Sequence, residues 1–251
     1  MNLSEIKKAH LIGIKGTGMS ALALALHSLG IRVTGSDSPD SFLLLPEQRF
    51  IDAGIIITSK FDPLNIPDDV DVVVVTTSFS KDNSEIIEAK RRGIPVLEYP
   101  EMIGLLTQSL ATYAVCGSHG KTTITNMLGW IAGSNGLSPL VIAGPTSPQV
   151  LDIISSQPPL TLRGGVIPPL KVRGGQGKLF ILEADEYQNK LRMYHPRGII
   201  LTHVDLDHPD FFKSKSDYQK AFADFVSRLP RNGFLIYWAD DQENQIVAKY
   251  S

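Results

Sequence analysis

The sequence predicts an α/β protein with a Rossmann-like parallel-sheet domain followed by an α/β ATPase domain that carries a phosphate loop (P-loop). Two observations point to this class. Short apolar runs alternate with segments of helical periodicity along most of the 251 residues, and this alternation is typical of doubly wound parallel sheets. In each half, a glycine-rich turn joins the first apolar run to the helix after it. Such turns commonly bind phosphate groups in α/β domains.

The first domain is expected over residues 1–107. Its predicted strands are short and apolar, at 10–14, 31–37, 55–58, 71–77 and 94–99. Helices are expected between these strands. The helix at 82–93 has a capping residue at its start, apolar residues at helical spacing, and glycine at its end.

The second domain is expected over residues 108–251. Its predicted strands lie at 112–117, 140–144, 179–185, 198–204 and 234–238, with the main helices at 121–136 and 216–229. An insertion at about 145–178 contains a tandem repeat, because PPLTLRGG at 158–165 recurs as PPLKVRGG at 168–175. Proline and glycine at this density cannot build a core, so the insertion is expected to be flexible or recently duplicated. The alternative is a basic flap over a nucleotide, since Arg163, Lys171, Arg173 and Lys178 are basic.

Composition excludes several classes of function. The formal net charge of −2 shows no basic excess, so no nucleic-acid partner is expected. The longest apolar run, at 19–31, is interrupted by His27 and is too short to cross a bilayer, and the N-terminus has no signal-peptide core. Cys116 is the only cysteine and is expected to be a small buried strand residue. These features favour a cytoplasmic protein without membrane insertion.

The strongest functional signal is GSHGKTT at 117–123, between a predicted strand and a predicted helix. Its backbone N–H groups would point at phosphate oxygens, Lys121 would neutralise the β- and γ-phosphates, and Thr122 stands where a hydroxyl binds Mg²⁺. The usual P-loop has a further glycine at the position of Val115. The predicted ATP-binding residues are Gly117, Ser118, His119, Gly120, Lys121, Thr122 and Thr123.

Acidic residues follow two other predicted strands of the same domain. EADE occupies 183–186 and DLDHPD occupies 205–210. Ligands collect at the carboxyl ends of strands in open α/β sheets. We therefore expect a Mg²⁺ site there, with Glu183 and His208 as protein ligands beside Thr122.

The glycine-rich turn of the first domain, GIKGTGMSALA, contains the pattern G-x-G-x-x-A at Gly16, Gly18 and Ala21. This pattern indicates a pyrophosphate-binding turn, and Asp37 stands where an acid commonly contacts a ribose hydroxyl. Taken alone, the turn is compatible with NAD or FAD. A redox function would, however, leave the ATP-type loop of the second domain unexplained.

Together the two domains resemble the Mur ligases, ATP-dependent amide-forming enzymes of peptidoglycan synthesis whose P-loop has the short form G-[TS]-x-G-K-[TS]. The resemblance rests on GIKGTGMSALA, TGSD, DNSEIIEAKRRGIPVLEYPEM, GSHGKTT and EADE, and it covers the chain except the repeat. It implies that the first domain holds a UDP-sugar and not a dinucleotide. The implied contacts are Gly16, Thr17, Gly18, Met19, Ser20, Asp37, Thr77 and Ser78.

Within the family, the motifs look most like the branch that joins L-alanine to UDP-N-acetylmuramate. EADEY and YWADDQEN are closer to the branch that attaches a murein peptide during recycling. Two positions depart from the family, which commonly has glycine at Lys15 and asparagine at His203. The resemblance also implies a C-terminal domain for the amine substrate, so the chain is expected to stop before it, with the second domain incomplete.

The resemblance implies that the lactyl carboxylate attacks the γ-phosphate of ATP and that an amine then displaces phosphate from the acyl phosphate. Lys121, Glu183 and His208 would carry this chemistry with Mg²⁺, and His208 must be neutral to bind the metal. Two other functions stay open. One is a catalytically silent module that binds UDP-sugar or ATP; the other is folylpolyglutamate-type ligation, which the glycine turn of the first domain disfavours.

Overall fold

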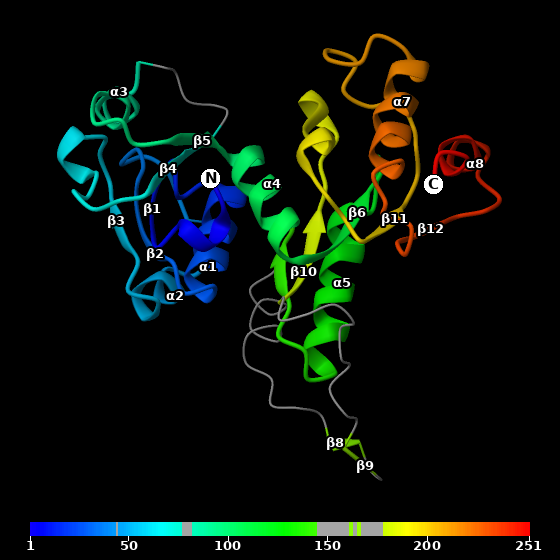
Figure 1. Cartoon of the computed structure of the whole chain (residues 1–251), viewed down its shortest axis with the longest axis horizontal. Coiled ribbons are helices and arrows are strands. Elements are labelled where there is room, and N and C mark those ends of the chain that lie inside the picture. Colours follow the sequence, from blue (N-terminus) through cyan, green and yellow to red (C-terminus); the bar gives the residue numbers. More distant parts are fainter. Residues whose placement is uncertain (44, 77–81, 145–160, 163–164, 167–177) are drawn as a thin grey trace. The chain divides into compact units, whose positions relative to one another are not determined.

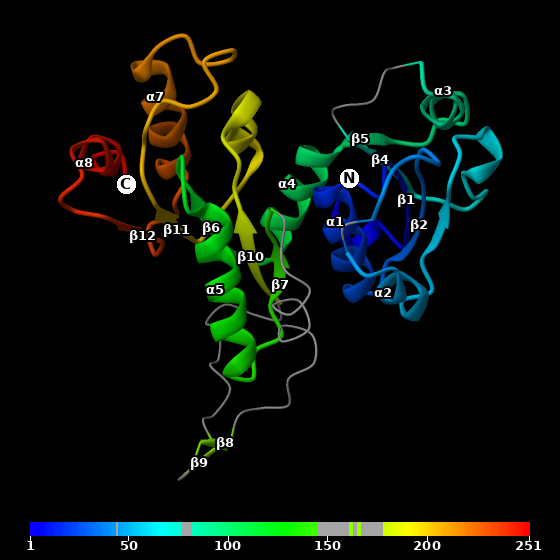
Figure 2. The same cartoon turned by 180° about the vertical axis from the view of Figure 1, so that it is seen from behind.

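The computed structural model describes residues 1–43, 45–76, 82–144, 161–162, 165–166 and 178–251. The chain divides into two compact units, Met1–Leu105 and Leu106–Ser251. Each unit contains one five-stranded parallel sheet with helices beside it (Figures 1 and 2). This confirms the predicted α/β class. In the described part of the chain, no helix is both long and apolar enough to cross a membrane.

The sheet of the first unit has the strand order β3-β2-β1-β4-β5. Its central strand β1 pairs in parallel with β2 on one side and β4 on the other. The strands are β1 (Lys8–Ile12), β2 (Arg32–Ser36), β3 (Ile56–Thr58), β4 (Val72–Val75) and β5 (Val96–Glu98). The helices are α1 (Thr17–Ser28), α2 (Glu47–Asp52) and α3 (Ser84–Arg91), with 3₁₀ turns η1 (Leu3–Glu5) and η2 (Pro63–Asn65). Helix α4 (Tyr99–Ser109) begins in this unit and continues past Leu105.

The core of the first unit forms where apolar strands are covered on both faces. All four residues of β4 are valines and all are buried, as expected for the inner strand of a parallel sheet. One cluster joins β1, β4 and α3 through Ile12, Val73, Val75, Ile86 and Ala89. Packing of the β1–α1 turn against β2 requires Gly35, because a Cβ atom there would lie 2.7 Å from the carbonyl oxygen of Leu11.

The sheet of the second unit has the order β12-β11-β6-β10-β7. Its strands are β6 (Ala111–Cys116), β7 (Leu140–Ile142), β10 (Leu179–Glu183), β11 (Gly198–Leu201) and β12 (Phe234–Tyr237). The helical segments are α5 (Lys121–Ser134), η3 (Tyr187–Met193), α7 (Lys215–Val226) and α8 (Gln242–Ala248). α5 packs on β6, β7 and β10, whereas α7 packs on η3 and α8 (Figure 1).

This strand order fixes where the site of the second unit forms. From central strand β6 the chain goes to β7 on one side, and it later returns to β11 on the other side. β10 and β11 both pair with β6 in parallel. The carboxyl ends of β6, β10 and β11 therefore meet at one edge, at the point where the strand order reverses, and ligands of open α/β sheets bind at such points.

Some predictions fall outside the described residues, namely Thr77, Ser78 and most of the insertion at about 145–178. Two short strands of the insertion are described. β8 (Thr161–Leu162) pairs antiparallel with β9 (Gly165–Val166), within and just after the first copy of the repeat.

Candidate nucleotide and metal site

The turn after β6 has the backbone of a phosphate-binding loop. Gly117 has φ +124° and Gly120 has φ +80°, conformations that side-chain-bearing residues rarely adopt. At Gly117 there is also no room, because a Cβ atom would lie 2.8 Å from the carbonyl oxygen of His203. Gly120 precedes the first residue of α5, so the amino end of a 14-residue helix faces the turn.

The loop is held by the segment that follows β11. The backbone N–H of Ser118 donates to the carbonyl oxygen of His203 at 2.6 Å. The Ser118 hydroxyl donates to the Asp205 carbonyl oxygen at 2.6 Å and accepts from the Asp205 N–H at 2.8 Å. These bonds fix the loop against a neighbouring strand end. His119 and Thr123, by contrast, are exposed.

Lys121, the lysine predicted to contact ATP phosphates, folds back over its own loop. Its Nζ donates to the carbonyl oxygen of Gly117 at 2.6 Å and lies 3.1 Å from Oε2 of Glu186. Glu186 has no exposed surface. Lys121 and Glu186 therefore form a largely buried ion pair at the loop.

Thr122 and Glu183, both predicted to bind Mg²⁺, lie together. The Thr122 hydroxyl donates to Oε1 of Glu183 at 2.8 Å. The other oxygen of Glu183 accepts from the backbone N–H of Gly144, just after β7. A Cβ atom at Gly144 would lie 3.0 Å from the Thr122 hydroxyl, so the close approach of β7 favours glycine. One hydroxyl and one carboxylate therefore face each other beside the loop.

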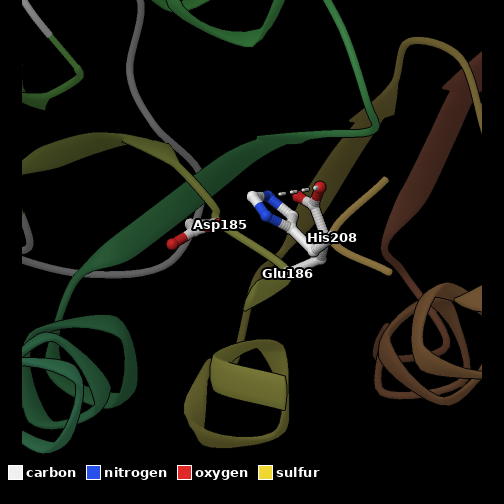
Figure 3. Close-up of side chains that lie close together, drawn as sticks. All are labelled: Asp185, Glu186 and His208. Atoms are coloured by element: carbon white, nitrogen blue, oxygen red, sulfur yellow. Dashed lines mark ion pairs between the residues drawn. The ribbon is translucent and has the colours of Figure 1, made fainter. Parts of the chain in front are cut away.

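A second group of possible metal ligands consists of Asp185, Glu186 and His208. One ligand atom from each lies within 4.8 Å of the others, and Figure 3 shows the His208 ring facing the carboxylate of Glu186. The distance from His208 Nε2 to Glu186 Oε1 is 4.0 Å. The Tyr187 ring packs on the imidazole with centroids 4.7 Å apart. Two carboxylates and an imidazole are a suitable donor set for a divalent cation.

The predicted ligands Glu183 and His208 thus fall into two neighbouring groups. Glu183 contacts Thr122, whereas His208 lies with Asp185 and Glu186. Glu186 was missed as a site residue, although its position within EADE could have suggested it. Cys116 is buried at the end of β6, and burial, together with the charge of Glu186, raises the pKa of its thiol. This agrees with a structural role.

His203 connects the loop to α8. Its ring forms ion pairs with Asp241 and, at 2.9 Å, with Asp205. Burial lowers the pKa of His203, but the two carboxylates raise it more, so the net pKa lies above its ordinary value. Asp241 also caps α8 by accepting from the backbone N–H groups of Glu243 and Asn244. The imidazole ring therefore joins the segment beneath Ser118 to the start of α8.

The predicted UDP-sugar residues of the first unit surround the turn between β1 and α1. Gly16 is exposed and Thr17 and Gly18 are partly exposed, whereas Met19 and Ser20 are buried. The Ser20 hydroxyl donates to the Thr17 carbonyl oxygen at 3.0 Å. A ligand at this turn would meet backbone N–H groups and the amino end of α1 more than side chains.

Asp37 supports this turn from beneath. Its carboxylate accepts from the backbone N–H groups of Lys15 and Ser38, both at 2.7 Å, and the residue is only 4% exposed. The Lys15 ammonium donates to Ser38 and Ser59. It lines a pocket of about 540 Å³ together with Ile57, Ser59 and parts of the segment after β2. This pocket beside the glycine turn has room for part of a nucleotide.

Comparison with known families matches both units. The model described as "Mur ligase family, catalytic domain" matches residues 8–110. The model described as "Mur ligase middle domain" matches residues 115–251, more than half of the chain. The chain belongs to the Mur ligase family.

Curated members of the Mur ligase family align along nearly the whole chain. A protein of Desulfitobacterium hafniense named UDP-N-acetylmuramate–L-alanine ligase is 32% identical over 96% of this chain and 49% of its own length. The protein of the same name from Syntrophotalea carbinolica is 36% identical over 97% of this chain and 48% of its own length. The chain spans about half the length of these curated relatives.

Solved structures of Mur ligases share the fold. A murein peptide ligase from Psychrobacter arcticus superposes with a TM-score of 0.72 at 26% identity, covering 97% of this chain and 51% of the other. The UDP-N-acetylmuramate–alanine ligase of Thermotoga maritima superposes with a TM-score of 0.69 at 22% identity, covering 96% and 51%. The second likeness supports the fold alone.

Proposed function

We propose that this chain is the UDP-sugar- and ATP-binding part of a ligase that joins L-alanine to the lactyl carboxylate of UDP-N-acetylmuramate in peptidoglycan precursor synthesis. ATP is the second substrate, and the reaction passes through an acyl phosphate. The amine would enter through a further domain that the longer relatives have room for. We place this reaction in the cytoplasm.

The observation that carries this proposal is the convergence of three groups at one edge of the second sheet. The loop with Lys121 follows β6, Glu183 ends β10 with Glu186 just beyond it, and His208 follows β11. Phosphoryl transfer demands little covalent chemistry from the protein but much charge neutralisation and positioning. An ammonium, backbone N–H groups and a cluster of cation ligands supply both.

Each residue has a distinct part in the proposed reaction. The N–H groups of residues 119–121 and the Lys121 ammonium bind the β- and γ-phosphates and offset their charge, whereas the N–H of Ser118 stays bonded to His203. The lactyl carboxylate must lie near the γ-phosphate despite carrying the same charge, so binding and orientation supply much of the catalysis. The amine then attacks the acyl phosphate, phosphate leaves, and the amide forms.

Mg²⁺ is the metal that family membership implies, and the residues present fit it. Thr122 with Glu183 would hold one ion, and Glu186 with Asp185 and His208 would hold a second. Such ions would supply positive charge that offsets the negative charge of the phosphate and carboxylate oxygens. His208 can bind a metal only as the neutral imidazole.

A murein peptide is the alternative amine substrate, and one observation favours it. The Psychrobacter arcticus structure named as a murein peptide ligase is among the structures that superpose well on this chain. The curated relatives that cover nearly all of the chain at 32–36% identity are, however, named for L-alanine. We therefore place L-alanine first.

The first test is calorimetric binding of UDP-N-acetylmuramate to the purified chain, with UDP and NADH as comparison ligands. The proposal expects the UDP-sugar to bind more tightly than NADH and ATP to bind independently at the second unit. Preference for NADH would refute the role of the first unit. Binding of both proposed ligands without turnover, even after a C-terminal domain is supplied, would favour the catalytically silent module.

A further inference from the structure

One tyrosine hydroxyl links the two halves of the second unit's site. Tyr218 lies on α7 and has no exposed surface. Its hydroxyl oxygen is 2.9 Å from the Ser118 hydroxyl in the P-loop and 2.9 Å from Oε1 of Glu186 in the metal-ligand cluster. Helical periodicity alone would explain a buried aromatic ring at this position, but it does not explain two polar partners on different loops.

The Tyr218 ring is fixed in place, which in turn fixes its hydroxyl. Phe212 packs edge-on at a centroid distance of 4.9 Å, and Phe222 packs edge-on at 5.1 Å. Edge-to-face packing of this kind stabilises one ring orientation. The hydroxyl therefore acts as a fixed point between two loops.

The donors and acceptors can be assigned by counting protons. The phenol has one proton, and the Glu186 carboxylate is the anionic acceptor that Lys121 stabilises. Tyr218 therefore donates to Glu186. The single Ser118 proton is shared between two acceptors within hydrogen-bond distance, the Tyr218 oxygen and the Asp205 carbonyl oxygen. Burial raises the pKa of the phenol, and the charge of Glu186 raises it further.

In this assignment the two carboxylate oxygens of Glu186 have different partners. Oε1 is held by Tyr218, and Oε2 pairs with Lys121 at 3.1 Å. A cation entering the cluster can replace Lys121 at Glu186 while Tyr218 keeps the carboxylate oriented. Lys121 is then released toward phosphate. Second-layer hydrogen bonds of this kind orient metal ligands and strongly affect metal affinity.

We propose that Tyr218 is a positioning residue that couples the metal-ligand cluster of Asp185, Glu186 and His208 to the P-loop. It orients Glu186 for a divalent cation and holds Ser118 in the P-loop. The inference rests on the proposed ATP and metal sites. It concerns a residue that contacts neither substrate. It explains why a buried tyrosine hydroxyl lies between two ligand-binding segments.

The test uses Mn²⁺ as the cation probe and ATP in EDTA as the nucleotide probe, each titrated alone into the purified chain. Tyr218→Phe keeps the ring and removes the hydroxyl. We expect it to weaken Mn²⁺ binding about 10- to 100-fold and to weaken ATP binding by a smaller factor. Tyr113→Phe is the matched control, because Tyr113 lies toward the other end of β6 and its ring packs on Phe234; it should change neither affinity.

Ser118→Ala provides a second, independent variant. It removes the loop side of the connection, together with the two Ser118–Asp205 bonds, and leaves the Tyr218–Glu186 bond intact. ATP binding should therefore weaken while Mn²⁺ binding stays within about twofold of wild type. This split between the variants would not arise from general loosening of the fold. If Tyr218→Phe is poorly folded, Ser118→Ala still decides the matter, because unchanged ATP affinity would exclude the connection.

The outcomes separate this inference from the proposed function. A wild-type chain that binds neither ATP nor Mn²⁺ refutes the proposed function and the inference with it. A wild-type chain that binds both, with Tyr218→Phe indistinguishable from it, refutes the inference alone. Equal losses in Tyr218→Phe and Tyr113→Phe would show a packing effect and also refute it.

Discussion

Nζ of Lys121 lies 3.1 Å from Oε2 of Glu186, a carboxylate with no exposed surface. The lysine that should bind phosphate is thus already paired with an anion. ATP binding must exchange this ion pair for contacts between Lys121 and phosphate oxygens. The exchange leaves Glu186 as a buried anion that needs a new cationic partner, because an unpaired buried charge is costly. A divalent cation is the natural replacement, so nucleotide and cation binding should favour each other.

Replacing Lys121 should move the two affinities in opposite directions. Lys121→Met removes the charge and keeps most of the stem. ATP binding should weaken about 10- to 100-fold, since bonds to charged groups are lost. Mn²⁺ binding without nucleotide should instead tighten, because Glu186 loses its competing cation. Calorimetric titrations measure both values.

UDP-N-acetylmuramate binding is the control for Lys121→Met. Its proposed site lies in the other unit, so its affinity should stay close to that of the wild type. Loss of both ATP and UDP-sugar binding would contradict the proposal that the first unit binds the UDP-sugar and the second unit binds ATP. Unchanged ATP affinity would contradict the role of Lys121.

Gly117 and Gly120 form a matched pair for testing the P-loop backbone. Both have positive φ, but a Cβ atom at Gly117 would contact Thr202 and His203, whereas one at Gly120 would meet nothing within 4 Å. Gly120→Ala should cost about 1–2 kcal/mol of unfolding free energy from backbone strain alone. Gly117→Ala should cost more, because the segment after β11 must also move.

Thermal unfolding and ATP binding of the two alanine variants test this ranking. The Gly117 variant should have the lower melting temperature and the weaker ATP affinity. Equal effects of the two substitutions would show that strain, and not the contact with the β11 segment, determines the loop conformation.

The fold could be predicted from the sequence because local signals agree with the tertiary structure. The four valines of β4 are apolar without alternation, and such runs occur in strands that are buried on both faces. Gly117, Gly120 and Lys121 identify their loop because its backbone conformation and its chemistry both restrict the residue types.

The pairing of acids in the site could not be predicted in the same way. Glu183 is the last residue of β10, and Glu186 lies beyond it with φ −80° and ψ −21°. Alternation along a strand no longer tells which way a side chain points there. The Tyr218 hydroxyl meets Ser118 across 100 residues of sequence, and helical periodicity marks Tyr218 only as a core residue.

Asp37 is predicted to support the glycine turn of the first unit in addition to its expected contact with ribose. Its two oxygens accept from the backbone N–H groups of Lys15 and Ser38. Asn has only one acceptor oxygen, so Asp37→Asn sets an NH₂ group against a backbone donor. We expect a loss of about 1–3 kcal/mol in unfolding free energy and weaker UDP-sugar binding.

Asp40→Asn is the control for Asp37→Asn, because Asp40 is exposed on the same segment. Denaturant unfolding and UDP titration should show no effect of this control substitution. If Asp37→Asn weakened UDP binding with stability unchanged, Asp37 would act only on the ligand and the supporting role would be wrong.

His203 should make the stability of the second unit depend on pH near neutrality. Its pKa in the folded chain is raised from the ordinary value of 6.5: burial lowers it, but Asp241 and Asp205 raise it more. A group with a raised folded pKa contributes its full stabilisation below its unfolded pKa, and loses it as pH rises through the folded pKa. Stability should therefore fall as pH increases above about 6.5.

Asp241 should make the stability of the second unit fall at acid pH as well. Burial raises its pKa, but the N–H groups of Asn244 and Glu243 and the charge of His203 lower it more, so the net pKa lies below its ordinary value of 3.8. Its stabilisation is present above that value and is lost as pH falls through the folded pKa. In urea unfolding experiments between pH 3 and 9, the midpoint concentration should be highest between about pH 4 and about pH 6.5. In His203→Gln, stability should fall less as pH rises above about 6.5. An equal fall in wild type and variant would show that another group causes it.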